Sequence, residues 1–108
     1  MEKTYKKLVR DNIPEIIEND NRKPITRVLT DDEFAFELER KLFEELNEVI
    51  DSGTADERIN ELADLYEVMA YLAVTEGKTM DDVVETAKKK RESRGGFDRK
   101  IFLEKVTD

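Results

Sequence analysis

Five acidic side chains lie close together in the chain, on the two sides of a predicted turn. Glu44, Glu45 and Glu48 precede the turn, and Glu61 and Asp64 follow it. Glu45 and Glu48 are spaced three residues apart, as are Glu61 and Asp64, so each pair shares one side of a helix. Two antiparallel helices joined by the turn would bring the pairs together. Carboxylate oxygens in such a place can hold a hard divalent cation such as Mg²⁺.

Capping signals predict the helices that carry these acids. Thr30-Asp31-Asp32-Glu33 and Thr54-Ala55-Asp56-Glu57 each have a hydroxyl at the N-cap and a Glu three residues later, which is the pattern of a capping box. They predict helices over about 31–51, ended by Ser52-Gly53, and 54–76, ended by Gly77.

Weaker elements surround these two helices. Thr79 with Asp82 predicts a third long helix over about 80–94, which Gly95-Gly96 ends. Asn12 and Pro14 predict a short helix that reaches about Asn19. Residues 3–11 suggest a short extended piece or an irregular arm, and residues 23–29 fit a short strand or an extended linker. We expect the tail after 96 to pack back on the body.

Helical periodicity places the acids against apolar residues. In the first long helix the apolar side is formed by Phe34, Leu38, Leu42, Leu46 and Val49; Glu45 lies inside it, Glu48 at its edge and Glu44 on the outer face. Glu61 and Asp64 border apolar residues of the second helix. Grouped, buried carboxylates repel one another and need compensation. Protonation, salt bridges to Arg40, Lys41 or Arg58, and a bound divalent cation are all open explanations.

The second long helix is apolar over roughly 240° of its circumference at 100° per residue. A helix that is apolar most of the way round is buried on several sides. A chain of 108 residues has few other helices to cover it. We therefore expect self-association, with the helix over 54–76 in the subunit interface.

Composition limits the function further. The chain fits one domain, 1–108, with 43% charged residues and a net charge of −8, which argues against a nucleic-acid groove. It has no long apolar run and no apolar segment typical of a signal peptide, so we expect no membrane partner and a cytoplasmic location. Without His or Cys, a Ser-His triad, a Cys nucleophile and a His-ligated zinc are impossible within the chain.

The acidic stretch, written as EExxE, twelve residues and then ExxD, resembles the signature of the all-α nucleotide pyrophosphohydrolases. This MazG-like superfamily includes phosphoribosyl-ATP pyrophosphohydrolase. KLVRDNIPEII at residues 7–17 and KKRESRGGF at residues 89–97 look like the flanks of small members that are labelled phosphoribosyl-ATP pyrophosphohydrolase-like. The resemblance extends over nearly the whole chain.

The resemblance implies an all-α helical bundle, built on two antiparallel long helices plus a third, that forms a dimer or a dimer of dimers. It implies Mg²⁺-dependent hydrolysis of a nucleoside triphosphate to the monophosphate and pyrophosphate, with Mn²⁺ as a possible substitute. The metal ligands would be Glu45, Glu48, Glu61 and Asp64. The catalytic carboxylates would be those of the first helix, in which Glu44 orients water or a second cation.

The resemblance also assigns cations to the substrate phosphates. Lys90 and Arg94 fall where the similar proteins bind phosphate, although basic residues near a helix C-terminus also suit the helix dipole. Arg10 is a further candidate, from the N-terminal arm. Two alternatives stay open: hydrolysis of phosphoribosyl-ATP in histidine biosynthesis, and a non-catalytic helical interaction domain whose acids form a solvated face.

Overall fold

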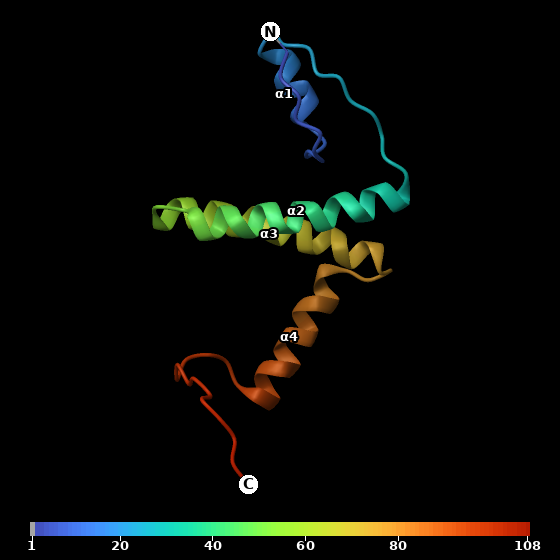
Figure 1. Cartoon of the computed structure of the whole chain (residues 1–108). Coiled ribbons are helices and arrows are strands. Elements are labelled where there is room, and N and C mark those ends of the chain that lie inside the picture. The colour runs from blue at the N-terminus through green and yellow to red at the C-terminus, as the bar shows by residue number, and fades with distance from the viewer. Residues whose placement is uncertain (1) are drawn as a thin grey trace.

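The computed structural model describes residues 2–108, which form four helices and contain no β-strand. The helices are α1 (Ile13–Asn19), α2 (Asp31–Asp51), α3 (Ala55–Thr75) and α4 (Met80–Arg94). The all-α prediction is therefore confirmed, and the three long helices lie within one residue of their predicted limits. Figure 1 shows α2 and α3 running antiparallel side by side, with α1 above this pair and α4 below it.

Side-chain caps explain where α2 and α4 begin. Thr30 Oγ1 accepts a hydrogen bond from the Glu33 N–H at 3.2 Å, and the Glu33 carboxylate accepts one from the Thr30 N–H at 3.0 Å. Thr79 and Asp82 form the same reciprocal arrangement at the start of α4. Each box satisfies backbone donors that the first turn of a helix leaves without partners.

The start of α3 is different. Thr54 Oγ1 accepts the Glu57 N–H at 3.1 Å, but the Glu57 carboxylate accepts a hydrogen bond from Gly53 N–H at 2.8 Å instead of from Thr54. The capping box predicted here is therefore only half formed. The Asn12 cap predicted for α1 is also incomplete, because Asn12 occupies the N-cap position without a side-chain hydrogen bond.

The segments outside the helices are extended or irregular. Residues 23–29 form the linker between α1 and α2, which decides between the two alternatives left open by the sequence. The prediction that the C-terminal tail packs back on the body is wrong: Phe97, Phe102 and Val106 are almost fully exposed. The reason is the course of α4, which leaves the α2–α3 pair and carries the tail away from it (Figure 1).

A single chain encloses little core. Among the residues that the structure describes, only Leu38 of α2 and Val68 of α3 are buried apolar residues, and Leu46, expected on the apolar side of its helix, is 44% exposed. Phe34 meets Tyr71 edge to face across the pair, with ring centroids 6.4 Å apart. The radius of gyration is 18.5 Å, against about 13 Å for a compact domain of this length. The described chain is thus a two-helix layer with flanking segments, and α4 does not complete a three-helix bundle.

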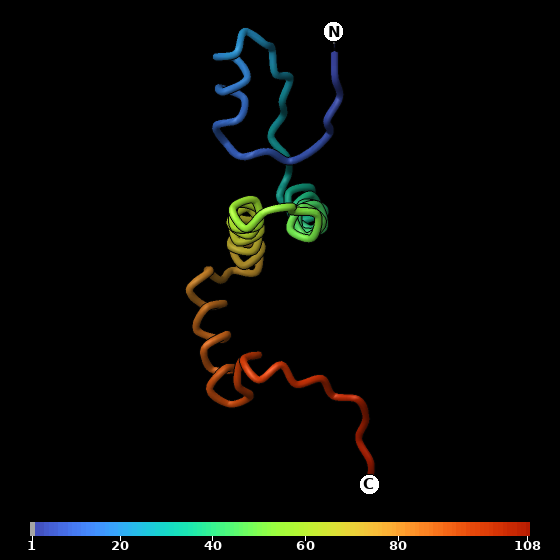
Figure 2. The backbone as a smooth tube through the Cα atoms, turned by 90° about the vertical axis from the view of Figure 1, so that its left-hand side faces the viewer, coloured from blue at the N-terminus to red at the C-terminus, as the bar shows by residue number. Residues whose placement is uncertain are grey.

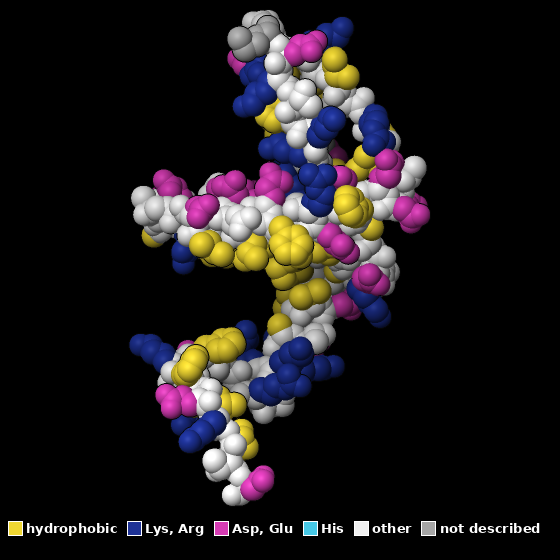
Figure 3. Space-filling view, viewed as in Figure 1, with side chains coloured by type: hydrophobic (Ala, Val, Ile, Leu, Met, Phe, Trp, Pro, Cys, Tyr) yellow, Lys and Arg dark blue, Asp and Glu magenta, His cyan; other side chains and the backbone are white. Residues whose placement is uncertain are grey.

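The two faces of this layer differ in chemistry. Figure 2 views the α2–α3 pair end-on, with the N-terminal segments on one side of it and α4 with the C-terminal tail on the other. In Figure 3 acidic side chains gather along the side that faces the N-terminal segments, and apolar side chains gather along the opposite side. Among the described residues no helix is long and apolar enough to cross a membrane.

Candidate metal centre

Three of the predicted acids converge between α2 and α3. Glu45 from α2 and Glu61 and Asp64 from α3 each offer a carboxylate oxygen, and the three oxygens lie within 4.8 Å of one another. The cluster thus combines both members of the predicted pair Glu61 and Asp64 with Glu45, but not Glu48, of the other pair.

The packing of α2 against α3 determines this convergence, and we call the line along which the two helices touch the α2–α3 seam. Glu45 follows the buried Leu38 by seven residues, or about two turns, and Asp64 precedes the buried Val68 by about one turn. The acids therefore continue the rows of side chains that pack the two helices together. As a result Glu45 is 8% exposed, although it carries a charge.

Burial and repulsion both act on Glu45. Loss of water around its carboxylate is the main reason that its pKa is raised, and the negative charges of Asp64, Glu44 and Glu61 raise it further. Lys41 opposes this rise, with its Nζ 3.8 Å from a Glu45 oxygen. One lysine does not cancel the effect of the burial and three acids, so the cluster favours further positive charge.

Part of that charge comes from the N-terminal arm. Arg10 Nη2 donates a hydrogen bond to Asp64 Oδ1 at 2.7 Å, and its Nη1 lies 3.6 Å from a Glu67 oxygen. The bond to Asp64 is the main cause of the raised pKa of Arg10. The arm therefore reaches the acidic cluster, and in the described chain Arg10 acts as a counter-ion of Asp64.

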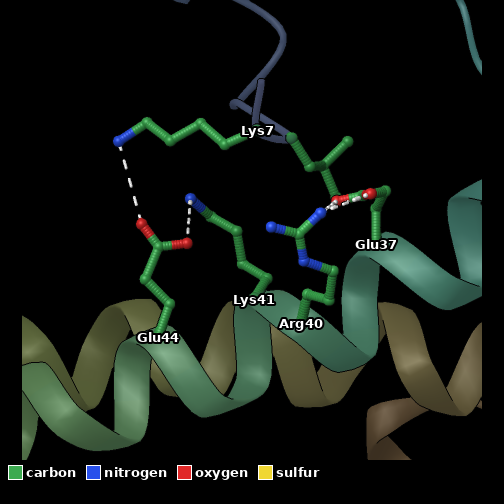
Figure 4. Close-up of a pocket in the computed structure, with 6 residues that line it drawn as sticks. Lys7, Glu37, Arg40, Lys41 and Glu44 are labelled. Atoms are coloured by element: carbon green, nitrogen blue, oxygen red, sulfur yellow. Dashed lines mark hydrogen bonds and ion pairs between the residues drawn. The ribbon is translucent and has the colours of Figure 1, made fainter. Parts of the chain in front are cut away.

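Glu44 belongs to a neighbouring group on the outer side of α2. Its carboxylate lies 3.8 Å from Lys7 Nζ and 3.6 Å from Lys41 Nζ, as Figure 4 shows. Arg40, beside them, pairs with Glu37 at 3.1 Å. These side chains surround a hollow of about 200 Å³ between the arm and α2, lined by Lys7, Leu8, Glu37, Arg40, Lys41 and Glu44. Glu44 thus pairs with Lys7 and Lys41 and is not one of the three clustered acids.

The other predicted site residues lie apart from the cluster. Glu48 is exposed and is not one of the three converging acids. Lys90 and Arg94 are exposed on the C-terminal half of α4, which points away from the α2–α3 pair (Figure 1). Within one chain these two cations do not share a site with the acids.

Two contacts of the site were missed or mistaken at the level of sequence. Glu67, the second partner of Arg10, lies one turn after Asp64 on the same side of α3, and that spacing was the available signal. Arg58, considered as a salt-bridge partner of the grouped acids, instead donates a hydrogen bond to Ser52 Oγ at 3.2 Å.

Comparison with known proteins gives one relative. The chain is 47% identical over 49 residues to an uncharacterized protein of Mycolicibacterium smegmatis. The match covers 45% of this chain and 50% of the relative, so the chain spans about half the length of the protein it matches. No family model matches the chain, and no solved structure matches it. A function must therefore be argued from the site itself.

Proposed function

We propose that the chain is a Mg²⁺-dependent nucleotide pyrophosphohydrolase, which cleaves a nucleoside triphosphate or related nucleotide to the monophosphate and pyrophosphate. The observation that carries the proposal is the convergence of Glu45, Glu61 and Asp64 at the α2–α3 seam. The resemblance of the acidic stretch to the pyrophosphohydrolase signature supplies the choice of reaction.

The donor set suits a hard divalent cation. Three carboxylates supply only oxygen ligands, which Mg²⁺ and Mn²⁺ accept. The raised pKa of Glu45 indicates that its charge lacks compensation in the chain alone. Glu45, Glu61 and Asp64 would hold the ion, and Glu48 is the fourth ligand on the signature alone. When bound, such an ion neutralises phosphate oxygens and acts as a Lewis acid.

The remaining residues would bind the substrate and move the proton. A water attacks the α-phosphorus, the α–β phosphoanhydride bond breaks, and pyrophosphate leaves. A carboxylate of α2 that is free of the ion accepts the proton of that water; Glu44 is our first choice because it lies outside the cluster of three. Arg10, whose side chain is 54% exposed, can reach a phosphate from the arm.

Lys90 and Arg94 fit the proposal only in an assembly. Because α4 carries them away from the acids of their own chain, a neighbouring copy would have to supply them. We accordingly include a homodimer or homotetramer in the proposal.

A substrate panel tests the reaction. Purified protein is incubated with NTPs, dNTPs and phosphoribosyl-ATP in the presence of Mg²⁺, and released pyrophosphate is measured. Pyrophosphate from phosphoribosyl-ATP alone would identify the histidine-biosynthetic variant. No pyrophosphate from any substrate, at enzyme concentrations above stray contamination, would reject the enzymatic proposal and favour the helical interaction domain.

Single substitutions then test the assigned ligands. Glu61→Gln and Asp64→Asn should each lower kcat by about two orders of magnitude, the usual scale for losing a group that stabilises transition-state charge. Glu48→Gln should do the same if the signature assigns it correctly. Glu39→Gln, an equivalent change at an exposed position of α2, is the matched control. Turnover that survives the changes at Glu61 and Asp64 would show that these residues are not the ligands.

A further inference from the structure

The N-terminal arm, residues 3–11, is anchored to both long helices by its cations. Lys7 Nζ lies 3.8 Å from a carboxylate oxygen of Glu44 on α2. Three residues later, Arg10 Nη2 donates a hydrogen bond at 2.7 Å to Asp64 Oδ1 on α3. The arm therefore crosses the α2–α3 seam between these two anchors, and Figure 2 shows it passing over both helices.

The arm crosses on the side of the layer where the candidate metal ligands gather. Figure 3 shows acidic side chains along the side of the α2–α3 pair that faces the N-terminal segments. Asp64, the partner of Arg10, is one of the three converging acids, together with Glu45 and Glu61. The arm thus lies across the side from which a cation or a phosphate would approach the cluster.

Little apolar packing holds the arm in this place. Among its residues only Leu8 and Val9 are partly buried, and the others are exposed. A hollow of about 200 Å³ lies between the arm and α2, and Lys7 and Leu8 line it from the arm (Figure 4). Ion pairs between partly exposed side chains are individually weak. A change of charge at the acids is therefore enough to shift the arm.

The chain that follows the arm does not fix it either. The arm leads into α1, which stands apart from the α2–α3 pair in Figures 1 and 2. The linker between α1 and α2 leaves Ile25 89% exposed and Val28 96% exposed. Segments with few buried apolar contacts open at little cost in free energy. The arm and α1 can therefore leave the layer together while α2 and α3 stay folded.

A divalent cation at the cluster would act on the same anchor. Mg²⁺ takes carboxylate oxygens at about 2.1 Å, which is closer than the 2.7 Å between Arg10 Nη2 and Asp64 Oδ1. An ion bound by Asp64 would also repel the guanidinium, because both are positively charged. If the arm weakens the binding of the ion, thermodynamic reciprocity requires that the ion weakens the contact of the arm by the same factor.

We propose that the N-terminal arm is a strap that covers the acidic cluster in the metal-free chain, and that a divalent cation opens it by taking Asp64 from Arg10. Opening clears the approach for the nucleotide phosphates and frees Arg10 to bind them. The proposal rests on the metal centre of the proposed function, but it does not depend on the hydrolysis itself.

Pulsed EPR tests the strap without any nucleotide. The chain has no cysteine, so nitroxide labels at Lys3→Cys in the arm and Glu39→Cys on α2 report one distance. In chelator the distances should be mainly those of the closed arm. Saturating MgCl₂ should lower the ratio of closed to open arms about two- to fivefold, the factor by which a contact of this strength opposes the ion. NaCl at equal ionic strength is the control for screening.

Asp64→Asn tests the anchor in the absence of metal. It removes the charge that holds Arg10, so it should open the strap in chelator about as far as Mg²⁺ opens it in the chain that keeps Asp64. Asp56→Asn, an exposed change in the first turn of the same helix, is the matched control and should leave the arm closed. An arm that stays closed after Asp64→Asn overturns the proposal, as does equal opening by MgCl₂ and NaCl.

Titration calorimetry with MgCl₂ on the same labelled protein separates the strap from the metal centre. Binding of Mg²⁺ without a change in the measured distance overturns the strap and leaves the metal centre in place. Absence of Mg²⁺ binding overturns both. Opening that follows Mg²⁺ binding supports the strap even if no nucleotide is hydrolysed.

Discussion

At the scale of single residues, the angle of each acid round its helix predicts its burial better than its spacing along the chain does. Glu45 lies roughly 20° from the line of the buried Leu38, and Glu48 lies roughly 80° from it. Glu45 is accordingly buried and Glu48 exposed. The sequence could place each acid on a side of its helix. It could not supply Arg10 as the partner of Asp64, because that contact joins residues 54 positions apart.

Glu45→Gln should stabilise the metal-free protein at neutral pH by on the order of 1 kcal/mol, because it removes a buried, repelled charge. The pKa of Glu45 is raised in the folded protein, so its ionised form opposes folding above that pKa. The penalty falls as pH drops through the raised pKa toward the ordinary value of 4.5. Thermal unfolding in chelator should show the gain at neutral pH and its decline in mild acid.

Glu39→Gln is the control for that measurement, since Glu39 is exposed on the same helix. It should leave the unfolding midpoint nearly unchanged at both pH values. Destabilisation by Glu45→Gln in chelator would mean that Lys41 already compensates the buried charge.

Arg10→Gln should tighten the binding of Mn²⁺ about two- to fivefold, because it removes a counter-ion that competes for Asp64. The Arg10–Asp64 pair is partly exposed, so its interaction free energy is about 0.5–1 kcal/mol after solvent screening. Titration calorimetry with Mn²⁺ in the absence of nucleotide measures the change.

Lys7→Gln removes the same charge from the same arm but faces Glu44. It should alter the Mn²⁺ affinity less than Arg10→Gln does. Equal effects from the two substitutions would assign the change to net charge rather than to the bond with Asp64.

At the scale of helices, local chemistry made the limits predictable. The caps at Thr30 and Thr79 act within four residues, and Gly77 and Gly95, with φ of 72° and 86°, adopt a left-handed conformation that suits glycine. The packing of the tail after residue 96 could not be predicted from such local signals, because its environment depends on the direction in which α4 leaves the layer.

Thr30→Ala should lower the free energy of unfolding by about 1 kcal/mol, the usual cost of losing a side-chain N-cap. It removes the acceptor of the Glu33 N–H and loosens the start of α2. Chemical denaturation measures the loss. Thr26→Ala, an exposed change in the preceding linker, should cost far less; equal losses would show that the box does not stabilise the helix.

At the scale of the whole molecule, the sequence correctly indicated that the helix over 54–76 has more apolar surface than one chain covers. Ile59, Tyr66 and Val74 of α3 are each more than half exposed. The exposed apolar surface of α2 was not anticipated, because Leu46 was placed on the apolar side that packs and Phe43 was left out of that side. A single-chain helical wheel shows which residues share a side but not which neighbour covers them.

If copies of the chain provide that cover, the thermal midpoint must depend on protein concentration. Unfolding of a dimer releases two chains, so a tenfold dilution removes about 1.4 kcal/mol of stability per dimer. For chains of this length that corresponds to a fall of about 3 °C in the midpoint. Differential scanning fluorimetry or calorimetry over a hundredfold range measures it.

Met69→Asp places a charge beside Leu62 and Tyr66, which are exposed apolar residues of α3, and should give a lower midpoint that no longer varies with concentration. Leu62 and Tyr66 would then lie against water in every molecule, as they do in the single chain. A wild-type midpoint that stays constant over the same range would mean that one chain is stable with the apolar residues of α2 and α3 exposed. The self-association that we propose would then have no energetic basis, while the acidic cluster would be unaffected.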